Sequence, residues 1–236
     1  MSQLLYEGKA KRIYATEEAG ILRVEYKNSL TAGNGKKKDE QDGKGELNNR
    51  ITALLFDYLA KKGVPSHFIK TLSPNEQLVK QVEIIPLETI TRNIATGSLV
   101  KRYGIKEGLT FKPALQEFSY KSDEHDDPLV YPSHAVAFGW ATQAEVDRIL
   151  ELANQVNSLL SELFDRLGIT LVDFKLEFGR DSEGNVLLAD EITPDTCRLW
   201  DKETGKKLDK DRFRQDLGDV LGAYREILRR LEEGLK

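Results

Sequence analysis

The sequence has a single cysteine and no long apolar run. One cysteine excludes a framework of disulfide bonds and is typical of a reducing compartment. No apolar stretch approaches the roughly 18 residues that would suggest a membrane span, and the first residues lack the apolar core of a signal peptide. We therefore expect a soluble, cytoplasmic protein without a membrane partner.

A surplus of positive charge is also missing. The chain contains 35 lysines and arginines against 39 aspartates and glutamates, which gives a net charge of −4 and a pI near 5.6. Proteins that bind mainly nucleic acid usually have the opposite balance, so no nucleic-acid partner is expected. His125 and His134 lack the partner spacing of a zinc site, and we interpret them as surface or substrate-side residues.

A chain of 236 residues is long enough for one domain or two small lobes. Short strand patterns and one helical pattern at 46–62 fill its first part, and Pro86 is expected to end the last of these strands. We predict an α+β fold with a small antiparallel-sheet lobe at 1–85 and a larger mixed lobe at 86–236. A cleft between two such lobes is a usual place for a small-molecule site.

The larger lobe contains two further helical patterns. Thr142 and Glu145 have the spacing of a capping box, which opens a long amphipathic helix that Gly168 ends. A last helix is predicted from Lys210 to about residue 231.

Between these helices, residues 171–190 have the pattern of a hairpin. Apolar and charged residues alternate over 171–178, which is the period of a half-buried strand. Residues 182–185 (SEGN) then supply a turn. If these four residues form the loop, Asp181 pairs with Val186 and Glu177 lies opposite Asp190.

Two carboxylates directly opposed on one sheet face destabilise a hairpin. A divalent cation with oxygen ligands, such as Mg²⁺, would turn the repulsion between Glu177 and Asp190 into ligation. The alternative is a solvated polar face on which one carboxylate pairs with Lys175. The spacing alone leaves both interpretations open.

Basic residues at three other places could hold phosphate groups. Lys9 and Lys11 are two apart and would point to the same side of an extended chain, although an exposed edge strand often shows the same pattern. Arg92 and Ser98, near the start of a short helix, could form an anion site or could be a surface arginine and a helix cap. Lys80 could project from a strand into the cleft or be solvated.

Together these segments resemble one family, phosphoribosylaminoimidazole-succinocarboxamide synthase or SAICAR synthetase, of purine biosynthesis. The resemblance covers essentially the whole chain. It rests on residues 8–11 (GKAK), 43–45 (GKG) with 48–49 (NN), 92–99 (RNIATGSL), 171–179 (LVDFKLEFG) and 190–201 (DEITPDTCRLWD).

The resemblance implies an ATP-dependent ligase that joins carboxyaminoimidazole ribotide to L-aspartate and releases SAICAR, ADP and phosphate. A carboxylate is a poor electrophile, so ATP would first convert it to an acyl phosphate, which the aspartate amine attacks. The protein would mainly position the reactants and neutralise charge. The family also implies a nucleotide cleft like that of ATP-grasp enzymes and kinases, and makes a homodimer plausible.

The resemblance further assigns roles to individual residues. It implies ATP-binding residues Lys9, Lys11 and Lys80, Mg²⁺ ligands Glu177 and Asp190, and ribotide-binding residues Arg92, Ser98 and Arg198. Lys175 and Lys121 are expected near the transferred phosphoryl group, and Asp173 is expected to orient Lys175.

Three positions depart from the family pattern. Asn28 and Ser29 stand where an acidic residue is usual, and Ser122 and Tyr131 each stand where asparagine is common. These departures leave the loop contacts and the aspartate pocket open.

Two other functions fit parts of the pattern. A small-molecule kinase could use the same lobes, lysines and paired carboxylates to transfer phosphate to a hydroxyl group. An RNA-binding module could use the lysine run at 36–38, but the acidic balance and the lack of interleaved aromatic residues disfavour it.

Overall fold

The computed structural model describes residues 3–33 and 35–236, and its strands form three antiparallel sheets. The strands are β1 (Leu4–Glu7), β2 (Lys11–Ala15), β3 (Ile21–Tyr26), β4 (Ser29–Ala32), β5 (Lys37–Glu40), β6 (Phe68–Ser73), β7 (Glu76–Lys80), β8 (Glu83–Ile94), β9 (Thr110–Tyr120), β10 (Leu129–Val130), β11 (Ile169–Arg180), β12 (Val186–Ala189) and β13 (Cys197–Asp201). The helices are α1 (Lys44–Lys61), α2 (Ser98–Tyr103), α3 (Pro132–Ala137), α4 (Gln143–Arg166), α5 (Asp211–Arg214) and α6 (Val220–Gly234), with a 3-10 turn, η1 (Asp123–His125).

The first sheet has the strand order β1-β2-β3-β7-β6. Its first two strands meet at a bend in which the Gly8 N–H donates to the Lys11 carbonyl at 2.9 Å. The bend separates Lys9, which precedes β2, from Lys11, its first residue. The sheet has a small buried apolar cluster, formed by Val24, Tyr26 and Val79.

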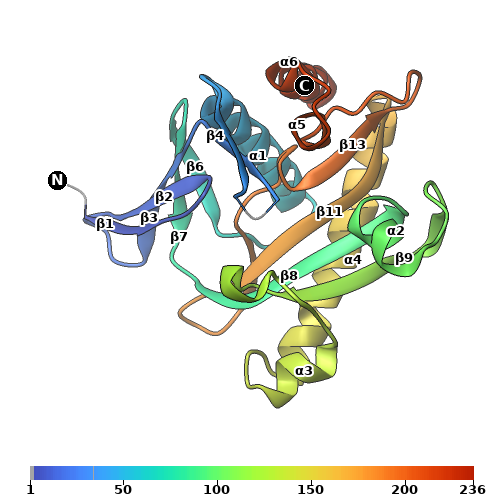
Figure 1. Ribbon diagram of the computed structural model, residues 1–236. Helices are drawn as coiled ribbons and strands as arrows, with labels where there is room; N and C mark the ends of the chain where they lie inside the picture. The colour runs from blue at the N-terminus through green and yellow to red at the C-terminus, as the bar shows by residue number, and fades with distance from the viewer. Residues whose placement is uncertain (1–2, 34) are drawn as a thin grey trace.

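The second sheet is organised around β11, the strand predicted from the alternation at 171–178. β8 pairs along one edge of β11, while β13 and β12 share the other edge, beside its first and second halves respectively. Between the stretches that pair with β13 and β12, the Lys175 N–H of β11 donates to the Thr196 carbonyl at 2.9 Å. Figure 1 shows α4 lying across one face of the sheet. The other face is left for the charged side chains of β11.

The main apolar core joins this sheet to the long helices. Phe174, Leu176 and Phe178 of β11 are buried in it, which confirms the predicted two-residue period. Helix α1 also packs here, beside α6 (Figure 1), through buried residues that include Ile51, Leu55, Phe56 and Leu59. The first sheet is thus attached to the main core by its own helix.

Helix α4 begins with the predicted capping box. The Thr142 N–H donates to Glu145 Oε2 at 2.7 Å, and the Glu145 N–H donates to Thr142 Oγ1 at 3.2 Å. Arg180, at the end of β11, donates to both carboxylate oxygens of Glu145 and to the Trp140 carbonyl. Glu145 therefore joins the start of α4 to the central strand.

This joint should be sensitive to acid. The hydrogen bond from Arg180 lowers the pKa of Glu145 from its usual 4.5 to about 2. The stabilisation is therefore complete above pH 4.5 and is lost as the pH falls toward 2. We expect Glu145→Gln to lower the free energy of unfolding by about 1 kcal/mol at pH 7 and by less at pH 3.

Urea denaturation at both pH values measures this difference. Glu151→Gln is the matched control, because Glu151 is exposed and forms an ion pair with the exposed Arg148 of the same helix. Equal losses for the two variants at pH 7, or a loss for Glu145→Gln that does not change with pH, would contradict the assignment.

The prediction that Pro86 ends a strand is wrong, because β8 continues through it. The pairing of β8 with β11 is irregular between Glu177 and Gly179, opposite this proline. A β-bulge tolerates a residue that has no N–H to donate. The break between strands lies at residues 81–82, and the domain boundary near residue 85 stays a prediction.

The single helix predicted after Lys210 is also wrong, since the chain forms α5 and α6 instead. Asp216, Gly218 and Asp219 have φ values of 56°, 68° and 46°, which no right-handed helix accommodates. The Arg212 side chain donates to the carbonyls of Leu217 and Gly218 at 3.1 and 2.7 Å and stabilises the break. Among the helices of the described ranges, none combines the length and apolar character needed to cross a membrane.

Candidate functional site

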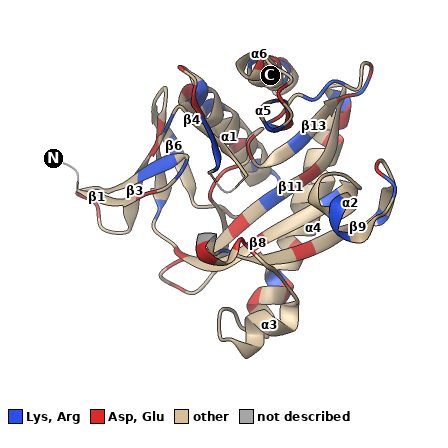
Figure 2. Cartoon of the chain, viewed as in Figure 1, with Lys and Arg blue, Asp and Glu red and all other residues tan. Residues whose placement is uncertain are grey.

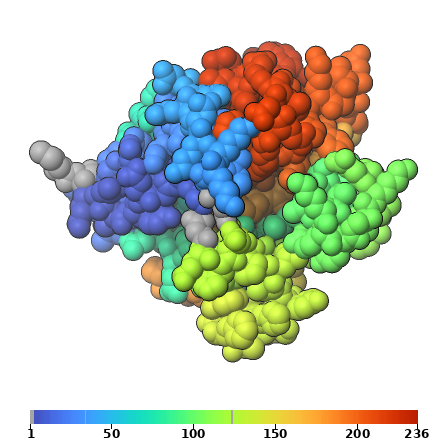
Figure 3. All heavy atoms as spheres, in the orientation of Figure 1, coloured from blue at the N-terminus to red at the C-terminus, as the bar shows by residue number. Residues whose placement is uncertain are grey.

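A cleft of about 400 Å³ lies between the β4–β5 hairpin, the polar face of β11 and the segment that follows β13. Figure 3 shows the hollow near the middle of this face, bordered by the light-blue β4–β5 region, the red C-terminal segments and the green α2–β9 region. Its charged lining residues are Lys9, Glu88, Arg92, Asp127, Asp173, Lys175, Glu191, Asp195, Arg198, Lys210 and Arg214.

One group of charges surrounds the second half of β11, where acidic and basic residues alternate (Figure 2). Lys175 Nζ lies 2.8 Å from Glu177 Oε1 and 2.9 Å from Glu88 Oε1. Lys121, which follows β9, forms an ion pair with the other oxygen of Glu177. Because Glu177 is buried, these two lysines supply its neutralising charge.

Asp190 completes this group, which we call the lysine cluster: Lys11, Lys121 and Lys175 with Glu177 and Asp190. Asp190 directly follows β12 and forms an ion pair with Lys11. Burial would raise the pKa of Asp190, but Lys11, Lys175 and Lys121 hold it well below its usual value. Burial would likewise lower the pKa of Lys11, which Asp190 and Glu191 raise instead. Lys11 and Asp190 are therefore both charged at neutral pH.

The hairpin register is one residue away from the predicted one. Glu177 pairs with Ala189 and Arg180 with Val186, so the prediction that Glu177 opposes Asp190 is wrong. The cause is Asp181, which belongs to the loop because its side chain accepts the N–H groups of Glu183 and Asn185 at 2.9 and 2.8 Å. Asp190 lies beyond the ladder with a φ of 59°.

A second group of charges, the arginine cluster, consists of Arg92, Ser98, Arg198 and Asp173. Asp173 Oδ2 accepts from Arg92 at 2.9 Å and from Arg198 at 2.8 Å. Arg92 also donates to Ser98 Oγ at 3.4 Å. Burial would lower the pKa of Arg198, but Asp173 and Asp211 raise it, so the guanidinium stays charged. Two arginines and a hydroxyl at one end of the cleft are hydrogen-bond donors of the kind that bind anions.

Comparison with known proteins agrees with this geometry. A family model described as SAICAR synthetase matches residues 4–231. A Listeria innocua protein named phosphoribosylaminoimidazole-succinocarboxamide synthase is 56% identical over 232 residues, which cover 98% of each chain. The chain belongs to the SAICAR synthetase family. The resemblance seen in the motifs is thereby confirmed.

Solved structures of the family show the same fold. The Ehrlichia chaffeensis phosphoribosylaminoimidazole-succinocarboxamide synthase is 47% identical, with a TM-score of 0.95 over 98% of each chain. A SAICAR synthetase in complex with ADP is 42% identical, with a TM-score of 0.93 over 96% of each chain. The predicted α+β fold class is confirmed by these SAICAR synthetase structures.

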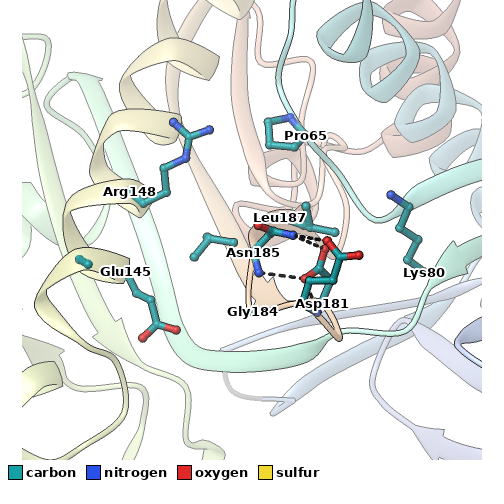
Figure 4. A pocket seen from close by; sticks show the side chains of 11 residues that line it. Pro65, Lys80, Glu145, Arg148, Asp181, Gly184, Asn185 and Leu187 are labelled. Carbon is teal, nitrogen blue, oxygen red and sulfur yellow. Dashed lines mark hydrogen bonds between the residues drawn. The ribbon is translucent and has the colours of Figure 1, made fainter.

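Six of the eleven predicted SAICAR synthetase site residues line the cleft: Lys9, Arg92, Ser98, Asp173, Lys175 and Arg198. Lys11, Lys121, Glu177 and Asp190 join Lys175 in the lysine cluster. One position and one role differ from the prediction. Lys80 is exposed and lines a different cavity, beside Arg148 of α4 and the β11–β12 turn (Figure 4). Asp173 was expected to orient Lys175, but it binds the two arginines. Glu88 and Glu177 hold Lys175 in its place.

Other residues of the cleft were not predicted. Asp195 accepts hydrogen bonds from Asn48 at 2.9 Å and Tyr224 at 2.6 Å and forms an ion pair with the buried Lys44. Glu191 is buried, and its Oε2 has no hydrogen-bond partner. Both acids lie inside the motif at 190–201, which was the available signal. Nothing in the local sequence pattern pointed to Glu88, Lys210 or Arg214.

We asked whether Glu177 and Asp190 could hold Mg²⁺. Within residues 3–33 and 35–236, no three His, Cys, Asp or Glu side chains are grouped closely enough to bind a metal by themselves. Mg²⁺ commonly takes only one or two protein carboxylates together with substrate phosphates and water. A buried carboxylate and a half-buried one, both with lysine counterions, fit that kind of site.

The three departures from the family pattern have local structural partners. Asn28 Oδ1 accepts the Gly45 N–H at 3.0 Å at the start of α1, and Ser29 donates to the Lys9 carbonyl. Ser122 lies 2.8 Å from the His125 ring nitrogen Nδ1. Tyr131 is 72% exposed at the start of α3. The contacts of Asn28, Ser29 and Ser122 therefore lie outside the two clusters.

Gly97 offers a test of the arginine cluster. Its φ is 61°, and a Cβ added there would lie 2.6 Å from a terminal nitrogen of Arg198. We expect Gly97→Ala to displace the guanidinium and to raise the KM for a phosphate-bearing substrate by about 10- to 100-fold, with ADP affinity unchanged.

Gly104→Ala is the control for a methyl group added at positive φ, at the other end of α2. Its ψ of 19° is left-handed helical, whereas Gly97 has a ψ of −130°, so the ADP affinity of Gly97→Ala serves as the measure of its additional strain. The φ of Gly104 is 64°, and no atom lies within 4 Å of the added Cβ. Steady-state kinetics of both variants separate strain from displacement. An equal rise in KM for the two variants would contradict the role of Arg198.

Proposed function

We propose that this chain joins carboxyaminoimidazole ribotide to L-aspartate and converts ATP to ADP and phosphate, with SAICAR as the product. The observation that carries the proposal is the placement of two charged clusters on one strand. Asp173 and Glu177 lie four residues apart on β11, which is roughly 13 Å along a strand. That separation suits a ribotide, which has a phosphate at one end and a carboxylate on its base.

The arginine cluster would hold the 5′-phosphate of the ribotide. Arg92 and Arg198 are fixed by Asp173 before the ligand arrives, so little of their side-chain entropy remains to be lost on binding. The Ser98 hydroxyl adds a donor from the start of α2. This arrangement would direct the other end of the ribotide toward the lysine cluster.

The lysine cluster would hold the phosphates of ATP. Glu177 and Asp190 are the proposed Mg²⁺ ligands, and a bound Mg²⁺ would neutralise phosphate charge along the transfer path. Lys11, Lys121 and Lys175 now neutralise these carboxylates and are close enough to exchange them for phosphate oxygens. Lys9 at the cleft rim is a further proposed phosphate ligand. Its position favours it over Lys80.

In the proposed reaction, an oxygen of the ribotide carboxylate attacks the γ-phosphorus of ATP, and ADP leaves. The aspartate amine then attacks the acyl carbon, phosphate leaves, and the amine proton passes to the surrounding solvent or phosphate. Lys175 lies between Asp173 and Glu177 on β11 and would neutralise the charge that develops on the transferred group.

Phosphate release tests the ligase directly. Purified protein should release phosphate from ATP only when ribotide and L-aspartate are both present, and should form one SAICAR per phosphate. Turnover without aspartate, or transfer to a hydroxyl acceptor, would favour the small-molecule kinase instead. The RNA-binding alternative has little support, because Lys37 in the lysine run donates to the Phe213 carbonyl at 2.6 Å and pairs with Asp216.

The family resemblance also implies an oligomeric state, a cellular location and a pocket for the second substrate. A homodimer, a cytoplasmic location and the pocket for L-aspartate stay predictions. The homodimer can be measured by analytical ultracentrifugation of the purified chain over a range of concentrations.

A further inference from the structure

Asp209 is a buried carboxylate outside both clusters, and its contacts lead to the arginine cluster. Its side chain is fully buried in the loop between β13 and α5. One oxygen, Oδ2, accepts the Leu199 N–H at 2.7 Å, and the other, Oδ1, accepts the Asp211 N–H at 2.7 Å. Leu199 follows Arg198 in the chain, and the carboxylate of Asp211 binds the side chain of Arg198.

Asp211 is the link to the cleft. Its Oδ2 accepts from Arg198 Nε at 3.0 Å, and its Oδ1 accepts from Arg214 at 2.7 Å. Arg198 and Arg214 both line the cleft. The orientation of two cations that face the ligand therefore depends on where the backbone of Asp211 lies.

Asp209 fixes that backbone position. Leu199 belongs to β13, so Asp209 ties the Asp211 N–H to a strand of the central sheet. The same loop is also held by backbone hydrogen bonds from Leu208 to Leu199 and from Lys210 to Pro194, at 2.8 and 2.9 Å. Arg198 of the same strand contacts the Asp211 side chain, whereas among the described residues Asp209 alone joins the Asp211 backbone to the strand.

We propose that Asp209 is a positioning residue for the ribotide end of the cleft, which sets Arg198 and Arg214 through Asp211. This inference rests on the proposed function, because it assumes that these arginines meet the ribotide phosphate. The role requires that the Asp209 side chain accept a hydrogen bond at each of its two oxygens. An asparagine supplies one oxygen and turns its NH₂ group against the second N–H.

Asp209→Asn is therefore the main test variant. We expect the KM for the ribotide to rise about tenfold, with kcat and the affinity for ADP each within about twofold of wild type. Affinity for the ribonucleoside that lacks the 5′-phosphate should not change, because the effect passes through the phosphate contacts. A general loosening of the fold would not spare this analogue.

Asp201→Asn is the matched control. Asp201 is also a buried acid of β13, and it caps the turn at Thr204 and pairs with Arg230, away from the cleft. This variant should lower Tm without raising the ribotide KM. If Asp209→Asn does not fold, Asp211→Asn, which weakens the contacts to both arginines, should raise the ribotide KM by at least as much.

Three results would overturn the proposal. They are an unchanged ribotide KM in folded Asp209→Asn, an equal loss for the ribonucleoside, or an equal rise in KM for Asp201→Asn. Failure of the Asp209 proposal can be distinguished from failure of the proposed function, because wild-type turnover with ribotide, aspartate and ATP is measured in the same assay. Loss of that wild-type activity would reject the ligase assignment itself.

Discussion

Asp190→Asn should lower kcat/KM by on the order of 10²–10³-fold and weaken Mg²⁺-dependent nucleotide binding. The substitution keeps the size of the side chain and removes its charge. Asparagine also tolerates the left-handed backbone of Asp190, where φ is 59°, so the fold should be little strained. Half of the carboxylate charge available to the metal is lost, and Lys11 keeps the longer ion pair with Glu191 at 3.8 Å.

Phosphate release over a range of Mg²⁺ concentrations and calorimetric titration with ADP and Mg²⁺ measure this effect. Asp181→Asn is the control, because Asp181 accepts backbone hydrogen bonds in the same hairpin and does not contact the lysine cluster. Ribotide affinity should stay within about twofold for both variants. Wild-type turnover of Asp190→Asn at limiting Mg²⁺ would count decisively against a metal at this position.

Arg198→Ala should produce the complementary result, with ribotide affinity lowered by about 10²–10³-fold and ADP affinity nearly intact. The guanidinium lies between the buried carboxylates of Asp173 and Asp211. Arg92 still neutralises Asp173 after the substitution, and Arg214 still neutralises Asp211. The fold should therefore survive with a lower Tm.

Arg198→Lys separates charge from geometry at this position. Lysine keeps the positive charge but cannot donate to both acids through one planar group. Its ribotide affinity should fall between those of wild type and Arg198→Ala. Calorimetric titration with ribotide and with ADP distinguishes the outcomes, and equal losses for the two ligands would show that Arg198 only supports the fold.

Patterns set by neighbouring residues were predictable from the sequence. The two-residue period of β11 and the capping box of α4 depend on local geometry, and both are present. The hairpin register was not predictable by counting turn residues. It depends on whether Asp181 extends the strand or uses its side chain to close the loop, and two short hydrogen bonds decide for the loop.

The pairing of charges in the cleft could not be predicted either. Lys11 and Lys121 reach Asp190 and Glu177 from distant parts of the chain, so no spacing near β11 reveals them. The family resemblance nevertheless named the members of both clusters, because it was carried by whole motifs and did not depend on local spacing. The break between α5 and α6 was not predicted, because the periodicity of apolar residues carries no information about the backbone angle φ.

The attachment of α1 has a consequence for how the chain can be divided. The first sheet has only a small cluster around Val24, Tyr26 and Val79, whereas its helix is buried beside α6 near the other end of the chain. A crossover between related sequences near residue 85 would therefore separate α1 from the surface that it packs against. Chimaeras of this family should exchange α1 and α6 as one matched pair, even though more than 150 residues lie between them.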